Sequence, residues 1–199
     1  MVTYETRFAA PSGLRDGALS LSTNERRPVR LHARIAQHMH PVRLALQSLG
    51  ELVWSDLGWL SPDEYTDRLE RTLDPVITVH PDRVFFEAFS QDESAYGVVI
   101  VDRAVFEDDG DVACGTTNVD FTRGLHQALG DMRTGADAHF HVGPAGFAVE
   151  SGDGGAHFES KVDLPDSWVR GFLQIQGAMA MPGTRVHARP VDLLRMIRY

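Results

Sequence analysis

The sequence has little cysteine, almost no lysine and no long hydrophobic run. One of its 199 residues is a cysteine, Cys114, so the chain can form no internal disulfide and offers no cysteine-based zinc site. It has no stretch of roughly 18 apolar residues, and it does not begin with the basic and then apolar segments of a signal peptide. We therefore expect a soluble, cytoplasmic protein without contact to a membrane.

Basic residues are few and unevenly placed. The net charge is −9; residues 1–50 hold seven basic against three acidic residues, whereas residues 51–199 hold twelve against twenty-five. This balance argues against a nucleic-acid-binding domain, because affinity for phosphate backbones needs basic surface. One local patch is the nucleic-acid candidate, and a solvated face is the simpler interpretation of it. The patch consists of Arg26, Arg27, Arg30 and Arg34.

Phosphate-binding loops are missing as well. No glycine-rich loop follows a predicted strand, and strands do not alternate strictly with helices, which argues against Rossmann-type and P-loop folds. What is present is a series of short strands, several with apolar residues at every second position, and amphipathic helices with apolar residues at helical spacing. Strands are predicted at residues 3–9, 18–22, 29–35, 76–80, 83–89, 96–106, 138–142, 146–150, 157–163 and 184–189. Helices are predicted from about residue 41, over 61–73, after an Asp120 N-cap, from 165 or 166, and from 190.

This pattern predicts the α+β class, with curved antiparallel sheets and helices packed on one face. Strands are followed by a helix three times, which indicates repeated strands-then-helix units without residue-by-residue identity. We predict N-terminal strands and helices over residues 1–73 and an α+β core region over 74–199. One continuous domain over 1–199 is the alternative.

Histidines suggest a metal site. His139 and His141 are two apart on a predicted strand, so both side chains leave the same face; His38 and His40 have the same separation. A metal needs a third ligand, and the sequence does not show which residue would supply it. The competing interpretation is a solvated strand face with Phe140 turned into the core.

Cys114 and Glu87 are the candidates for catalysis. Cys114 follows a strand and precedes a predicted helix start, where a helix dipole would stabilise a thiolate, but it also needs a base such as His126 or His80. A small buried thiol is the simpler interpretation. Glu87 could pair with Asp92 or Glu93 in acid–base work, although a solvated hairpin turn explains these acids equally well.

Four segments resemble bacterial SWIM zinc finger family proteins. They are LSLSTNERRPVRLHARI (19–35), DPVITVHPDRVFFEAFSQDESAYG (74–97), CGTTNVDF (114–121) and WVRGFLQIQGAMAMPGTRVHARPVDLLRMIRY (168–199). That family is named after a Cys-x-Cys and Cys-x-His zinc motif, which is absent here, so the resemblance implies either the N-terminal portion of such a protein or a form that has lost the zinc finger. It also implies that any zinc belongs to a missing downstream segment and that none is held within this chain.

The leading hypothesis is a non-enzymatic interaction module of a SWIM zinc finger-like protein, with a protein partner or a nucleic acid. The alternative is a metal- or Cys-dependent hydrolase that uses Cys114 or the His139/His141 pair. The sequence leaves the identity of any small-molecule ligand open.

Overall fold

The computed structural model describes residues 13–15, 18–20, 28–55, 75–133, 135–152, 155–164 and 166–183, with residues 187, 189, 191 and 192. The chain forms two compact units, Met1–Leu164 and Pro165–Tyr199. The strands predicted at 3–9 and 184–189 and the helices predicted at 61–73 and from 190 lie wholly or largely outside the described residues.

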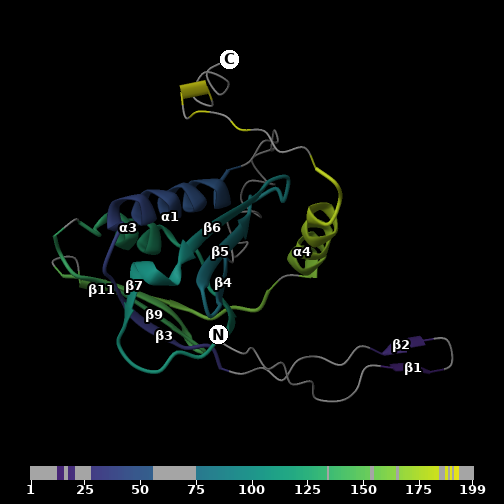
Figure 1. Cartoon of the computed structure of the whole chain (residues 1–199), viewed down its shortest axis with the longest axis horizontal. Coiled ribbons are helices and arrows are strands. Elements are labelled where there is room, and N and C mark those ends of the chain that lie inside the picture. Colours follow the sequence, from purple (N-terminus) through teal and green to yellow (C-terminus); the bar gives the residue numbers. More distant parts are fainter. Residues whose placement is uncertain are drawn as a thin grey trace, which may run out of the picture. The chain divides into compact units, whose positions relative to one another are not determined.

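Two antiparallel sheets form the first unit (Figure 1). The order is β11-β10-β9-β3-β7 in the five-stranded sheet and β6-β5-β4-β8 in the four-stranded sheet, and a separate pair joins β1 (Gly13–Arg15) to β2 (Ala18–Ser20). The five-stranded sheet consists of β3 (Leu31–Ile35), β7 (Phe106–Asp108), β9 (Ala138–Gly143), β10 (Gly146–Ser151) and β11 (Gly155–Ser160). The four-stranded sheet consists of β4 (Val76–Val79), β5 (Arg83–Phe89), β6 (Tyr96–Asp102) and β8 (Gly115–Asn118). The predicted α+β class is confirmed.

The order of elements contains one unit twice: a strand, a helix and three further strands. The first copy is β3, α1 (Met39–Val53), β4, β5 and β6; the second is β8, α3 (Arg123–Gly130), β9, β10 and β11. The two copies exchange their opening strands, because β3 pairs with β9 and β8 pairs with β4. Since β3 precedes residue 73 and its partners follow it, this exchange favours one continuous domain through Leu164 over a division at residue 73.

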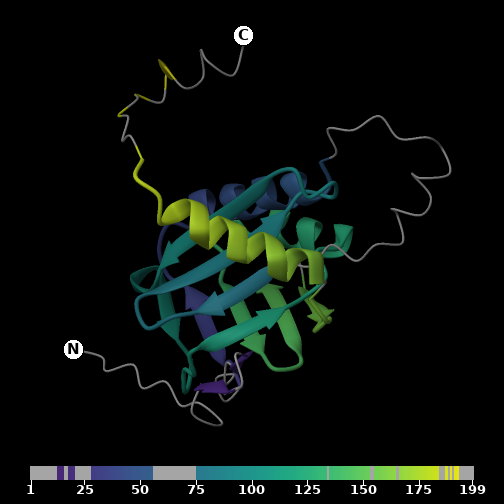
Figure 2. The same ribbon diagram turned by 90° about the vertical axis from the view of Figure 1, so that its right-hand side faces the viewer.

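The inner faces of the two sheets meet in the core. The ring of Phe86 on β5 lies 6.2 Å from that of Phe140 on β9 and 6.1 Å from that of Phe147 on β10. Helices α1 and α3 pack against each other on the same side of the sheets in both views (Figures 1 and 2), α1 against β5 and β6 and α3 against β10 and β11. The buried stripe of α1 has the spacing that the sequence predicted: Val42, Leu46, Leu49 and Val53.

Two glycines let each helix approach the edge strand of its own repeat. A Cβ on Gly97 of β6 would lie 2.4 Å from Leu52 Cδ2 of α1, and one on Gly124 of α3 would lie 2.5 Å from His157 Cε1 of β11. Both distances are shorter than any ordinary carbon contact. A side chain at either position would require Leu52 or His157 to move.

Three local predictions differ from the structure. Thr122, and not Asp120, caps α3, since its hydroxyl accepts a hydrogen bond from Leu125 N–H (3.1 Å). Residues 96–106 divide into β6, a 3-10 turn (η1, Arg103–Val105) and the first residue of β7, because the Asp102 carboxylate caps the turn at Ala104 N–H. Residues 115–118 form strand β8 instead of a helix start; their β-branched threonines suit the pairing with β4.

In the Pro165–Tyr199 unit, α4 (Asp166–Met179) begins where the sequence predicted. Trp168 is buried and its ring lies 6.4 Å from that of Phe172. Among the described residues no helix has the length and apolar character needed to cross a membrane.

Candidate interaction surface

An apolar strip runs along the outer face of the four-stranded sheet. We define it as Phe85, Val98 and Ile100. Phe85 is opposite Ile100 in the β5–β6 pairing. Val98 lies two residues before Ile100, so its side chain is on the same face of the sheet. Val98 is 41% exposed and Ile100 is 52% exposed, whereas Val101, next along the strand, is buried on the inner face. Exposed neighbours of this kind favour contact with another apolar surface.

Polar groups border the apolar strip on both sides. At one end the Tyr96 hydroxyl donates to Glu87 Oε1 (2.6 Å), and burial together with this bond raises the pKa of Tyr96 well above its usual value. At the other end His80 Nδ1 lies 2.6 Å from Asp82 Oδ1, and this bond holds the pKa of Asp82 below its usual value. The Glu87 carboxylate is therefore engaged with a tyrosine hydroxyl.

Strand β6 is also the edge of its sheet. In the described part of the chain no strand pairs with it on the side away from β5. Four consecutive aliphatic residues, 98–101, occupy its middle, and its one charged residue is Asp102 at the end. Edge strands in soluble proteins usually carry charges, prolines or bulges that prevent pairing, and β6 has none of these in its middle.

The outer face of the five-stranded sheet is polar. His32 on β3 is opposite His141 on β9, with 3.2 Å between their Nδ1 atoms, and the rings of His139 and His141 stack with centroids 6.3 Å apart. Glu150 Oε2 lies 3.6 Å from His141 Nε2. Phe140 between them is fully buried, as the alternation predicted.

The predicted histidine pair gains one further imidazole, but it does not become a ligand set. No group of three or more His, Cys, Asp or Glu among the described residues is arranged to hold a metal ion. His38 and His40 lie at the start of α1, where His38 is the N-cap residue with φ 55° and His40 Nδ1 is 3.1 Å from Arg43 Nη2. His32 was missed because its partner is 109 residues away, and only the β3–β9 register brings them together.

The predicted basic patch is partly neutralised. Arg34 forms an ion pair with Glu107 across the β3–β7 pairing and a second one with Asp137 (3.4 Å). The bond to Glu107 raises the pKa of Arg34. Arg30 is exposed on the same face, and Arg26 and Arg27 lie outside the described residues. Two carboxylates beside Arg34 reduce its availability to a phosphate group.

Cys114 is not placed as a nucleophile. It precedes β8, and α3 begins only at Arg123, so the predicted helix start does not directly follow the thiol. Burial raises the pKa of Cys114, against a smaller opposing effect of Arg103. A nucleophilic thiol needs a lowered pKa and a base within hydrogen-bond reach, and within the described ranges no histidine bonds to it.

Sequence reasoning missed a polar cluster beneath α3. The buried Glu159 on β11 accepts from the Thr122 hydroxyl and lies 2.6 Å from His157 Nε2. In a catalytic triad the histidine stands between hydroxyl and carboxylate, whereas here the carboxylate stands between the other two. The cluster therefore attaches the start of α3 to β11. The alternation of His157, Phe158 and Glu159 was the available signal, since it puts both polar residues on the face opposite Phe158.

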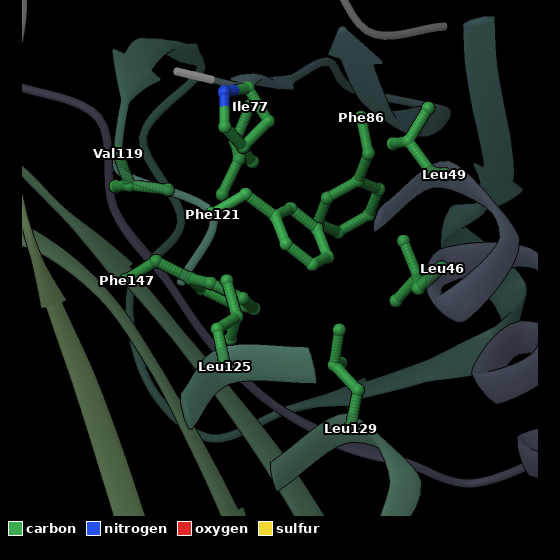
Figure 3. A pocket seen from close by; sticks show the side chains of 10 residues that line it. Leu46, Leu49, Ile77, Phe86, Val119, Phe121, Leu125, Leu129 and Phe147 are labelled. Atoms are coloured by element: carbon green, nitrogen blue, oxygen red, sulfur yellow. The ribbon is translucent and has the colours of Figure 1, made fainter. Parts of the chain in front are cut away.

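A small apolar cavity lies in the core (Figure 3). Its volume of about 10 Å³ has room for about one water molecule and is far below the several hundred Å³ of a ligand pocket. Side chains from both helices and both sheets surround it, including Leu46, Phe86, Leu129 and Phe147. It is a gap between packed elements and not a binding site.

No family model matches this sequence, and no curated protein matches it. Among solved structures, the chain is similar to a sliding clamp (DNA polymerase III subunit beta) from Pseudomonas aeruginosa bound to griselimycin. The identity is 12% and the TM-score 0.42, over 82% of this chain and 34% of the clamp. It is also similar to the beta sliding clamp of C. crescentus, with 16% identity and a TM-score of 0.43 over 70% of this chain and 32% of that one. The chain thus spans about a third of the length of each clamp. At these TM-scores no residue role passes from the clamps to this chain.

Proposed function

We propose that this chain is a non-enzymatic interaction module that binds a protein partner through the apolar strip of the four-stranded sheet. The exposure of Val98 and Ile100 next to each other on an unprotected edge strand is the observation that carries the proposal. Completing the burial of each of these two side chains would contribute on the order of 1 kcal/mol to binding. The hydrogen-bonded rim around Tyr96 and Asp82 gives a partner polar groups to match.

The Pro165–Tyr199 unit supports the same function independently. Half of the exposed large apolar side chains of the described residues belong to it: Val169, Leu173, Met179, Met181 and Val191. Leu173 is 63% exposed and Met179 is 79% exposed. Methionine adapts its shape to irregular surfaces and is common where proteins bind one another. This unit would therefore offer a second contact to a partner.

The likeness to SWIM zinc finger family proteins fits such a module, which we place in the cytoplasm. The zinc motif of that family needs three cysteines, and Cys114 alone does not supply them. Any zinc of such a protein would be bound outside these residues. A nucleic acid is the less supported partner, because Arg34 is already paired with acids and the net charge is −9.

The hydrolase alternative has less support. The raised pKa of Cys114 opposes thiolate formation, and the engaged Glu87 is no free acid–base group. The contact between His32 and His141 is the observation that would favour a metal-dependent enzyme. Two results together would favour the enzyme over the interaction module. The purified chain would contain stoichiometric metal that is lost in His141→Ala, and it would turn over a member of a substrate panel.

The test is quantitative recovery of partners from cells that express the tagged chain or one of two variants. Ile100→Lys places a charge in the apolar strip, and Phe158→Lys places it on the outer face of β11, where Phe158 is 55% exposed. We expect Ile100→Lys to reduce recovery of at least one partner about tenfold while Phe158→Lys leaves it unchanged. Equal recovery with all three chains would overturn the proposal.

A further inference from the structure

The backbone of β6 has N–H and C=O groups that point away from β5 and could pair with a further strand. Ser90 N–H donates to Ala95 O and Arg103 N–H donates to Asp82 O, both at 2.9 Å. Because bonded and non-bonded pairs alternate along an antiparallel ladder, these two bonds set the phase of the whole β5–β6 pairing. Gly97, Val99 and Val101 bond to β5, and the N–H and C=O groups of Val98 and Ile100 point away from it.

We propose that β6 pairs antiparallel with β6 of a second copy of this chain, across a two-fold axis at Val99. This places Val98 of one copy opposite Ile100 of the other, so that the outward-pointing groups of both residues bond to each other. The two Val98–Ile100 pairs would form about four hydrogen bonds between the copies. The proposal rests on the proposed function, because it names the partner of the same strand.

The side chains of β6 are complementary to themselves in this register. Val98 and Ile100 share the outer face, so the axis joins the apolar strips of the two copies into one that continues from Phe85 to Phe85. Tyr96 of one copy comes opposite Asp102 of the other, and therefore no like charges face each other across the axis. The strand is therefore complementary to a second copy of itself, and pairing needs no residue outside β6.

Strand β11, an edge strand of the five-stranded sheet, is less suited to such pairing than β6. In β11 one large apolar side chain, Phe158, faces outward, and its neighbour on that face is the small Ala156. Pairing of β6 with β11 of the next copy would be head-to-tail and would add further copies, into a ring or an open chain, instead of closing at two. A two-fold β6 pairing closes at the dimer and uses an edge strand with two outward aliphatic side chains, Val98 and Ile100.

The experiment combines mass and hydrogen exchange on the full chain. Over a concentration series, light scattering should show the mass rising from 22.0 kDa toward twice that value and no further. Amide exchange at Val98 and Ile100 should slow with concentration, while the amides of Val99 and Val101 stay protected throughout. A monomer at every concentration, larger assemblies, or a dimer without this alternation would each overturn the β6 pairing.

Two variants at one position separate backbone pairing from apolar contact. Val98→Pro removes an outward N–H without breaking a bond to β5, and Val98→Thr keeps the N–H and the branched shape. We expect Val98→Pro to weaken dimerisation at least about tenfold and Val98→Thr to weaken it by less than about threefold. Protection of the Val99 and Val101 amides reports that each variant is folded. Equal loss with both variants would contradict backbone pairing and leave the partner-recovery test of the proposed function unaffected.

Discussion

Strands β6 and β11 occupy equivalent places in the two repeats, yet their surroundings differ. Each is the last strand of its repeat and an edge strand of its sheet, and each is approached by a helix at a glycine. The contact at Gly97 is made by the apolar Leu52, whereas that at Gly124 is made by His157, which belongs to a buried polar cluster. The comparison shows that the fold requires an edge strand at this place in each repeat. It does not require the outward-facing side chains of that strand to be apolar. The exposed aliphatic residues of β6 are therefore best explained by contact with another molecule.

The largest expected effect tests whether both sheets contribute to one shared hydrophobic core. Phe86→Ala on β5 and Phe140→Ala on β9 each remove a buried ring from the shared core. We expect each to lower the free energy of unfolding by about 3–5 kcal/mol, measured by urea denaturation. A loss below about 1 kcal/mol for one of them would show that its sheet is not part of a common core.

A smaller effect is expected at the polar cluster of β11. Glu159→Ala leaves His157 and the Thr122 hydroxyl without their shared acceptor beneath α3, which should cost about 1–3 kcal/mol of unfolding free energy. Glu159→Gln is the matched control, since it keeps the size and one acceptor oxygen and should cost less. If both substitutions were neutral in thermal unfolding, the cluster would not attach α3 to β11.

On the β6 side, Tyr96→Phe removes the bond to Glu87 and should cost about 1 kcal/mol. The pKa of Tyr96 is raised in the folded chain, so its contribution to stability is complete below about pH 10 and is lost as the pH rises toward the folded value. Phenolate absorbance should therefore show one tyrosine fewer titrating near pH 10 in the wild type than in the denatured chain. If the Tyr96→Phe variant lost one tyrosine from those that titrate near pH 10, the raised pKa of Tyr96 would be contradicted.

The smallest effect concerns the rim of the apolar strip. The bond from His80 lowers the pKa of Asp82, so His80→Ala should return that pKa toward its ordinary value. The contribution of Asp82 to stability is present above its unfolded pKa and lost as the pH falls through the lower folded one. Carboxyl chemical shifts followed with pH measure the change, and an unchanged midpoint would show that the neighbouring Arg83 is responsible instead.

Much of the fold was predictable because it follows from local periodicity. The alternation in β3 and the stripe of α1 are each determined by neighbouring residues, and both elements appear as predicted. Strand β8 was missed because Gly115 and two threonines have no apolar alternation, and only the pairing with β4 makes them a strand. The exchange of opening strands between the repeats is likewise a long-range property that no local pattern contains.

The candidate site was less predictable. Val98 and Ile100 were read as parts of a strand, but which of four consecutive aliphatic residues face outward depends on the register with β5. The contact of His32 with His141 and the cluster at Glu159 depend on pairings between distant segments in the same way. The roles suggested for Cys114 and Glu87 depended on neighbours that the fold does not bring to them.

The most direct test of the account is site-specific photo-cross-linking inside cells. A photoreactive amino acid replaces Val98 in one chain and His139, on the outer face of the other sheet, in a second. The account predicts a covalent adduct with another polypeptide from position 98, of twice the chain mass if the partner is a second copy, and none from position 139. Adducts from position 139 alone, or from neither position, would contradict the assignment of the apolar strip as the interaction surface.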